Sequence, residues 1–185
     1  PLFRQFATLF IASSFGVPND RLGVFKLWSA ASLDAPVLEM QEGDTQNRYL
    51  VAKNAVLDMI REQVKVRKER FARGEQPKDL TDLMAAAEDR LSPTIVVDNL
   101  FNFTLGAFDT TERWLGNLII KLANSPDIRA RVAADRKLVE PFVEEVMRHT
   151  TVVQVIERKV KKDGVVVAGA KQKAGDTKYQ MFGAA

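Results

Sequence analysis

The chain has 185 residues, of which 46% are hydrophobic and 28% are charged, a composition typical of a globular protein with its own core. Its 27 Lys and Arg residues are nearly balanced by 24 Asp and Glu residues, so the net charge of +3 gives little reason to expect a nucleic-acid partner. The absence of cysteine excludes disulfides, a Cys nucleophile, Cys-ligated zinc and iron–sulfur clusters within these residues.

The first two predicted elements are helices separated by a turn. Residues 2–15 carry apolar side chains at helical spacing, and Gly16 is suited to end this helix. Asn19 or Asp20 is suited to cap a second helix that runs to about Ala31.

A long helix is predicted over residues 45–73, after a connection over residues 35–47 that we expect to be mobile. Its buried stripe is expected to consist of Leu50, Leu57, Ile60, Val64 and Phe71. The basic run Lys65–Arg70 has two interpretations, a nucleic-acid patch or a solvated helix face. Because no aromatic residues are interleaved with these charges, we favour the solvated face.

The longest predicted element is a helix over residues 93–124, preceded by a short helix over residues 79–90. Ser92-Pro93 supplies an N-cap and a proline at the first helical position, and the pattern continues to Ser125-Pro126. At 1.5 Å per residue such a helix is roughly 48 Å long. Its first two-thirds are apolar on nearly every face, so we expect it to run through the middle of the domain.

Two shorter helices are predicted next. Ser125-Pro126 is suited to cap the first, and residues 137–149 form the second, in which Pro141 is tolerated only near the first turn. After Thr151 the sequence changes to short β-branched segments separated by glycines, which is typical of strands and turns.

These patterns predict a mainly α fold with a small β region at the C-terminal end. We expect a single domain over residues 1–185, helical over residues 1–150 and strand-rich over residues 151–185, with no linker to a second domain.

The segment "LGAFDTTERW", residues 105–114, places polar groups inside the longest apolar helix. Asp and Thr are poor residues for a helix interior because their side chains compete for backbone hydrogen bonds. The hydroxyl of Thr110 can reach the carbonyl of Gly106, where glycine would let the helix widen or bend. Such an opening could hold a ligand or water beside Asp109; alternatively, Asp109 faces solvent or pairs with Arg113.

The segment "FVEEVMRH", residues 142–149, holds a second charged motif. Glu145 and Arg148 are three residues apart and therefore share one helix face, although such pairs are common and prove little alone. We expect His149, the only histidine, to be a packing residue and not a ligand.

Together, these segments resemble the central part of a bacterial cytochrome P450, a haem-thiolate monooxygenase. Residues 106–111 are similar to the family's small-small-x-acid-Thr-Thr motif, and residues 125–135 and 138–149 to the helices that follow it, the second with a Glu-x-x-Arg motif. Residues 153–176 resemble the β region after them, with its Gly-x-x-x-x-x-Gly turn. The resemblance covers essentially the whole chain and implies a partial cytochrome P450 fold built round a long central helix.

The resemblance implies a role for each motif residue in the long helix. Asp109 and Thr110 match the acid–alcohol pair beside the dioxygen that the family's haem iron binds. Thr110 would hydrogen-bond that oxygen, and Asp109 would help to relay the protons needed for O–O cleavage. Gly106 and Ala107 would form the small surface over which the oxygen sits on the haem.

Further roles are implied near the C-terminus. Glu145 and Arg148 match a structural ion pair that stabilises the haem-binding core. Arg158 matches a basic residue that pairs with a haem propionate; alternatively, it is an exposed strand arginine. The substrate pocket could be lined by Val152, Val153 and Val155.

The sequence departs from the family in one decisive respect. The family's axial iron ligand is a Cys thiolate in a Gly-rich loop, and this chain has no Cys. The chain also opens without Met and ends at "MFGAA", and both ends look cut from something larger. We therefore expect a fragment that is inactive by itself, contributes no metal ligand and binds no haem stably. The alternatives are a haem-free binding or interaction module derived from the family, and an unrelated helical protein with coincidental motifs.

For the complete enzyme, the resemblance implies haem b, a small organic substrate and a ferredoxin-type or flavin electron donor. No uninterrupted apolar run approaches the roughly 20 residues of a membrane span, so we expect a cytoplasmic protein with no membrane partner. A partial fold is also expected to expose apolar sides of its central helix, and therefore to self-associate or to bind a partner.

Overall fold

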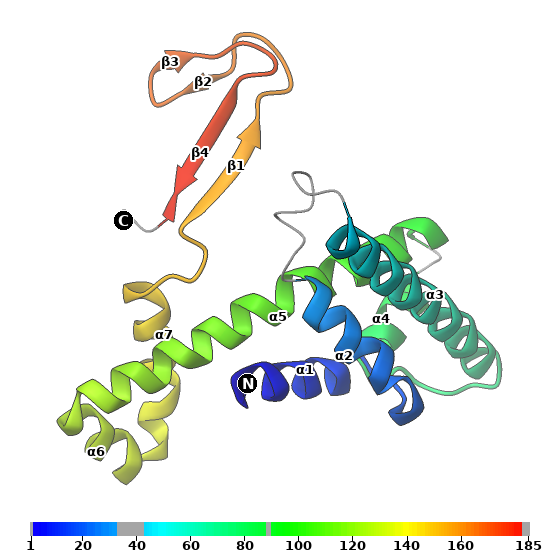
Figure 1. Ribbon diagram of the computed structural model, residues 1–185, viewed down its shortest axis with the longest axis horizontal. Coiled ribbons are helices and arrows are strands. Elements are labelled where there is room, and N and C mark those ends of the chain that lie inside the picture. Colours follow the sequence, from blue (N-terminus) through cyan, green and yellow to red (C-terminus); the bar gives the residue numbers. More distant parts are fainter. Residues whose placement is uncertain (1, 33–42, 88–89, 183–185) are drawn as a thin grey trace. The chain divides into compact units, whose positions relative to one another are not determined.

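The computed structural model describes residues 2–32, 43–87 and 90–182. The chain divides into two compact units, Pro1–Glu112 and Arg113–Ala185. The long helix α5 (Pro93–Asn124) contributes residues to both units. Among the described residues, the first unit is built from helices, and the second combines helices with short strands (Figure 1).

The helices of the first unit follow the predicted order. They are α1 (Leu2–Ser14), the short 3-10 helix η1 (Asn19–Arg21), α2 (Leu22–Ala31), α3 (Asp44–Ala72), α4 (Leu80–Ala86) and the first part of α5. Residues 35–42 of the predicted mobile connection lie outside the described residues. Its last residues belong to α3, which begins at Asp44, and α4 ends short of the predicted Arg90.

The core of the first unit is formed where α2 packs against α3 and α5 (Figure 1). Phe25 and Trp28 of α2 are fully buried, and the Phe25 ring meets the edge of Phe108 on α5 at 5.1 Å between ring centroids. The Trp28 indole N–H donates to Thr104 Oγ1 at 2.8 Å, so the polar atom of this large side chain is paired inside the core. Aromatic packing and one buried hydrogen bond therefore join α2 to α5.

The buried face of α3 is shifted from the predicted stripe. Ile60 and Val64 are buried as expected, but Leu50 is 43% exposed. Ala52 and Val56 are fully buried instead, because small and β-branched residues allow α3 to approach the large aromatic side chains of α2. The prediction for Leu50 is wrong, because it weighted side-chain size over the fit to the neighbouring helix.

Helix α5 buries one stripe of its apolar surface. In the first unit its buried positions are four residues apart: Val96, Leu100, Thr104 and Phe108; Leu118, which belongs to the second unit, is also buried. Ile95 and Phe103, on other faces, are 46% and 49% exposed, and Ile119 and Ile120 are also exposed. Helix α5 therefore carries apolar side chains on several faces, as expected. In the first unit, only one of these faces is buried against other described residues.

The basic run on α3 is not entirely a solvated face. The Arg67 side chain is only 4% exposed, and its Nε lies 3.1 Å from Oδ1 of the fully buried Asp82 on α4. Arg67 also donates to the carbonyl of Gly16 at 2.8 Å and to Asp79 at 3.2 Å. Arg67 of α3 therefore contacts both the turn after α1 and helix α4. The prediction that this basic run is a solvated helix face is wrong at Arg67.

The turn after α1 is shaped around this cluster. Gly16 has φ +62°, a left-handed conformation that favours glycine. A Cβ at this position would lie 1.9 Å from Asp79 Oδ2 and 2.7 Å from an Arg67 nitrogen. Only glycine therefore lets the backbone pass this close to the charged groups.

The second unit begins with the end of α5 and continues with α6 (Pro126–Ala134), η4 (Arg136–Leu138) and α7 (Val139–His149). Pro141 lies in the first turn of α7, as predicted. Ser125 occupies the position before α6, but its side chain makes no capping hydrogen bond, so the predicted cap is wrong in that detail. Pro126 at the first helical position needs no N–H partner, which lets α6 begin without a side-chain cap.

The β region follows α7. Strand β1 (Val155–Lys159) pairs antiparallel with β4 (Thr177–Met181), and β2 (Val166–Val167) pairs with β3 (Ala170–Lys171) in a hairpin between them (Figure 1). Ala168 and Gly169 both have positive φ, as a tight hairpin turn requires. The predicted mainly α fold with a small C-terminal β region is confirmed.

The Arg67–Asp82 pair should be the most sensitive charged contact in the first unit. Asp82→Asn is expected to lower the free energy of unfolding by about 3–5 kcal/mol, because it leaves a buried guanidinium short of negative charge. Urea unfolding followed by circular dichroism measures the change. Asp58→Asn is the matched control, since Asp58 forms an exposed pair with Arg61 at 2.8 Å and should contribute about 1 kcal/mol or less. Equal losses in the two variants would contradict the structural importance of Arg67.

Candidate functional site

The polar motif in α5 lies in the first unit. Helix α5 is α-helical without interruption from Pro93 to Asn124, so no widening of the helix accompanies Gly106. The hydroxyl of Thr110 donates to the Gly106 carbonyl at 2.5 Å, the contact that their four-residue spacing predicts. The motif is therefore accommodated in a regular helix, with the Thr110 hydroxyl folded back on the preceding turn.

The Asp109 carboxylate lies near a cation that sequence reasoning missed. Arg4 of α1 places one terminal guanidinium nitrogen 3.8 Å from Asp109 Oδ1 and its Nε 2.5 Å from Glu112 Oε2. The same side chain donates to the carbonyl of Ser29 on α2 at 3.1 Å. Arg4 therefore links three helices at the acidic step of the motif. One signal was available in the sequence, because Arg4 is the only charged residue of α1.

Gly106 has no side chain and Ala107 has only a methyl group, so the helix backbone is little covered beside Thr110. Gly106 is exposed and Ala107 is half-buried. Apart from its two chain neighbours and the backbone of its own helix within four residues, no described atom lies within 4 Å of the position that a Cβ on Gly106 would take. The segment therefore presents bare backbone next to a hydroxyl and a carboxylate, a surface that a flat group could approach closely.

Glu145 and Arg148 form a two-pronged ion pair on α7. Arg148 Nε donates to Glu145 Oε2 at 2.8 Å, and a terminal nitrogen donates to Oε1 at 2.7 Å. Both side chains are well exposed in this chain. The hydrogen bond from Arg148 lowers the pKa of Glu145 below its usual value.

Arg158 lies on β1, opposite Lys178 of β4. Its side chain is exposed, and its guanidinium donates to the Glu157 carbonyl at 3.1 Å. His149 is also exposed, with Nδ1 3.3 Å from Thr150 Oγ1, so the expectation that it is a packing residue is wrong for this chain. Of the predicted pocket-lining valines, Val152 is half-buried and Val153 and Val155 are exposed.

The predicted site residues fall into two groups. Gly106, Ala107, Asp109 and Thr110 belong to the first unit, whereas Glu145, Arg148 and Arg158 belong to the second.

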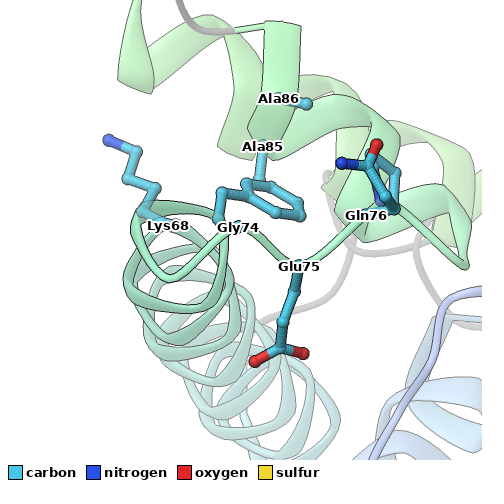
Figure 2. Close-up of a pocket in the computed structure, with 8 residues that line it drawn as sticks. Lys68, Gly74, Glu75, Gln76, Ala85 and Ala86 are labelled. Atoms are coloured by element: carbon cyan, nitrogen blue, oxygen red, sulfur yellow. The ribbon is translucent and has the colours of Figure 1, made fainter.

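A separate pocket of about 490 Å³ lies between the end of α3 and α4. Figure 2 shows Ala85 and Ala86 on one side of it, while the side chains of Lys68 and Glu75 point away from each other. The Glu75 carboxylate accepts a hydrogen bond from Arg70 at 2.8 Å, which lowers its pKa. The polar groups therefore do not converge on this pocket, and it contains none of the motif residues.

The described residues contain neither a cluster suited to a metal ion nor a helix suited to span a membrane. Within residues 2–32, 43–87 and 90–182, no group of three or more His, Asp or Glu side chains is placed to hold a metal ion. No helix in this part of the chain combines the length and the hydropathy needed to cross a membrane.

The Glu145–Arg148 pair gives a pH-dependent prediction. Arg148→Gln should raise the pKa of Glu145 toward its ordinary value, because the donated hydrogen bonds are removed. Since the folded-state pKa is the lower one, the stabilisation is present at neutral pH and is lost as the pH falls through that value. Carbon-detected NMR titration measures the pKa. Glu75, paired with Arg70, is the internal control and should titrate unchanged; a shared shift would indicate global unfolding.

Comparison with known proteins identifies the relatives of this arrangement. Residues 24–177 match the family described as Cytochrome P450. The chain is 35% identical to cytochrome P450 123 of Mycobacterium tuberculosis over 88 residues, which are 46% of this chain and 22% of that protein. It is 30% identical to cytochrome P450 133B2 of Xylella fastidiosa over 116 residues, which are 61% of this chain and 29% of that protein.

Its fold is similar to that of the ligand-free structure of cytochrome P450 TbtJ1, with a TM-score of 0.77 at 24% sequence identity. That match covers 96% of this chain but 46% of the TbtJ1 chain, so the chain spans about half the length of this relative. With the family match extending from α2 into β4, the chain belongs to the cytochrome P450 family.

Proposed function

We propose that the chain is the central part of a haem-dependent monooxygenase that hydroxylates a small organic substrate. The observation that carries this proposal is the Gly106–Thr110 segment of α5, where bare backbone, a hydroxyl and a carboxylate adjoin on one regular helix. Membership of the cytochrome P450 family supports it.

The proposal gives each residue of this segment a task. Because Gly106 and Ala107 have small side chains, they leave space for a flat cofactor and a small reactant next to the helix backbone. Thr110 presents its hydroxyl to the reactant, and Asp109 receives and passes on protons through solvent. Asp109 and Thr110 are consecutive residues whose side chains lie about 100° apart round the helix, so a proton passes between them through solvent and not by direct contact.

The residues of this chain fit one face and a propionate of haem b, but they do not fit its iron. The Gly106 surface suits one face of the macrocycle, and the exposed Arg158 guanidinium suits a propionate. The iron of this family requires a thiolate, and the chain supplies no Cys. When bound in the complete protein, haem supplies the iron at which dioxygen is activated. We therefore propose that this chain alone holds no haem stably and is inactive.

The second unit has a supporting task in this proposal. The bidentate Glu145–Arg148 pair fixes the end of α7 and thereby the start of the β region that carries Arg158. It acts through the fold and touches no substrate. We further propose that the complete enzyme works in the cytoplasm with a ferredoxin-type or flavin electron donor.

A haem-free interaction module is the alternative. Two observations favour it: the chain has no Cys, and apolar residues are exposed on α1 and α5. The exposed residues include Leu2, Phe6 and Phe10 on α1, where the rings of Phe6 and Phe10 stack at 6.2 Å. Such a surface suits self-association or a protein partner.

The two proposals differ in what the complete gene encodes. If the chain is part of an enzyme, its reading frame continues into a Gly-rich loop with a Cys. The product of that frame should then show the carbon-monoxide difference spectrum of thiolate-ligated haem, whereas residues 1–185 alone should not. A frame that stops after Ala185, together with a monodisperse and cooperatively folding chain, would support the haem-free module and contradict the enzyme.

Substitutions in the enzyme encoded by the complete frame test the relay. Asp109→Asn and Thr110→Ala are each expected to lower kcat for hydroxylation by about 10²-fold, because each removes a group that handles protons. The rate of product formation at saturating substrate measures the effect. Thr111→Ser is the control, since Thr111 has no assigned task and the substitution keeps its hydroxyl. Unchanged turnover in Asp109→Asn would exclude the proposed relay.

A further inference from the structure

Arg4 occupies an unusual place for a charged residue. It is the only charge on α1, its side chain is 18% exposed, and it points toward α2 and α5. Burial of a guanidinium to this extent requires partners on most of its N–H groups. Arg4 finds them on two other helices, which fixes the direction of the side chain.

The α2 side of this contact is buried and hydrogen-bonded. Arg4 donates to the Ser29 carbonyl at 3.1 Å, and Ser29 itself is only 2% exposed. The Ser29 hydroxyl shares a hydrogen bond of 2.8 Å with Thr8, whose own hydroxyl lies 2.8 Å from the Arg4 carbonyl. The guanidinium is therefore held in place independently of the acids that it meets on α5.

Two acids of α5 share this one cation unequally. Glu112 Oε2 lies 2.5 Å from Arg4 Nε, a short charge-assisted contact, whereas Asp109 Oδ1 lies 3.8 Å from a terminal nitrogen. The second distance exceeds that of a hydrogen bond but lies within the range of an ion pair. The acids are three residues apart and thus neighbours on one helix face.

We propose that Glu112 controls how tightly Arg4 holds Asp109, and that Arg4 and Glu112 are positioning residues for the proton relay. This inference rests on the proposed function in one respect only, the assignment of the relay to Asp109. By occupying the nearest N–H of Arg4, Glu112 keeps the Arg4–Asp109 contact long. Arg4 then attracts the Asp109 carboxylate without binding it directly.

The alternative is that Arg4 has only a structural role and holds α1 against α5. A purely structural role would need only the contacts with Ser29 and Glu112. Removal of Glu112 would then leave Arg4 with one partner fewer and change nothing at Asp109. Under our proposal, removal of the Glu112 charge has a different result. Asp109 closes the gap of 3.8 Å, takes over the guanidinium and is withdrawn from the relay.

The test begins with the 185-residue chain itself. The Nε–H resonance of Arg4 is assigned by its loss in Arg4→Lys, and its exchange with water is measured by NMR. Glu112→Gln keeps the size of the side chain but removes its charge. We expect the Arg4 Nε–H to shift yet to remain slow to exchange in Glu112→Gln, because Asp109 replaces Glu112.

The double variant Asp109→Asn/Glu112→Gln leaves neither acid and should exchange about tenfold faster or more, as expected for loss of a charge-assisted hydrogen bond. Asp109→Asn alone should leave the resonance almost unchanged. The Nε–H of Arg61, in its exposed pair with Asp58, is the internal control. If Glu112→Gln exchanges as fast as the double variant, Asp109 does not take over and the proposal is wrong.

A second measurement separates this proposal from the proposed function. In the enzyme encoded by the complete frame, Glu112→Gln should lower kcat with KM unchanged, and adding Asp109→Asn should lower it no further. Full activity of Glu112→Gln beside an impaired Asp109→Asn would overturn the role of Glu112 but not the relay. Full activity of both variants would overturn the relay, while the exchange data would still report how Arg4 is shared.

Discussion

The first unit depends on the need to neutralise one buried cation. Arg67 lies near the C-terminal end of α3, and removing its charge from water is favourable only if acids and carbonyls surround it. Asp82 must then lie inside α4, and the chain must turn sharply at Gly16 to bring its carbonyl within reach. The positions of three segments distant in sequence follow from this requirement.

The motif in α5 is held by contacts on both sides of Gly106. Two residues before it, Thr104 accepts a hydrogen bond from Trp28, and two residues after it, Phe108 packs against Phe25. Arg4 adds a third contact at the acidic end. Because these partners come from α1 and α2, the geometry of a site on α5 depends on helices that contain no motif residue themselves.

The sequence predicted the helices well, since helix ends carry local signals. Ser92-Pro93 predicted the start of α5, and the change to β-branched segments after Thr151 predicted the strands. Exposure and pairing were predicted less well, because they depend on residues far away in the chain. The sequence near Arg67 does not indicate that this side chain is buried and paired with an aspartate on another helix. Likewise, Leu50 is as apolar as Ile60, although only Ile60 is buried. The pairing of Arg4 with the acids of α5 has the same origin.

The hydrogen bond of Thr110 has a consequence for the chemistry of its hydroxyl. A hydroxyl carries a single hydrogen, and here that hydrogen is directed to the Gly106 carbonyl. In this rotamer, the outward side of the oxygen offers only lone pairs, so Thr110 can accept from an approaching molecule but cannot donate to it. Rotation about the Cβ–O bond reverses this polarity. The Gly106 carbonyl remains paired with the helix backbone meanwhile, so one bond rotation converts an acceptor into a donor at little cost.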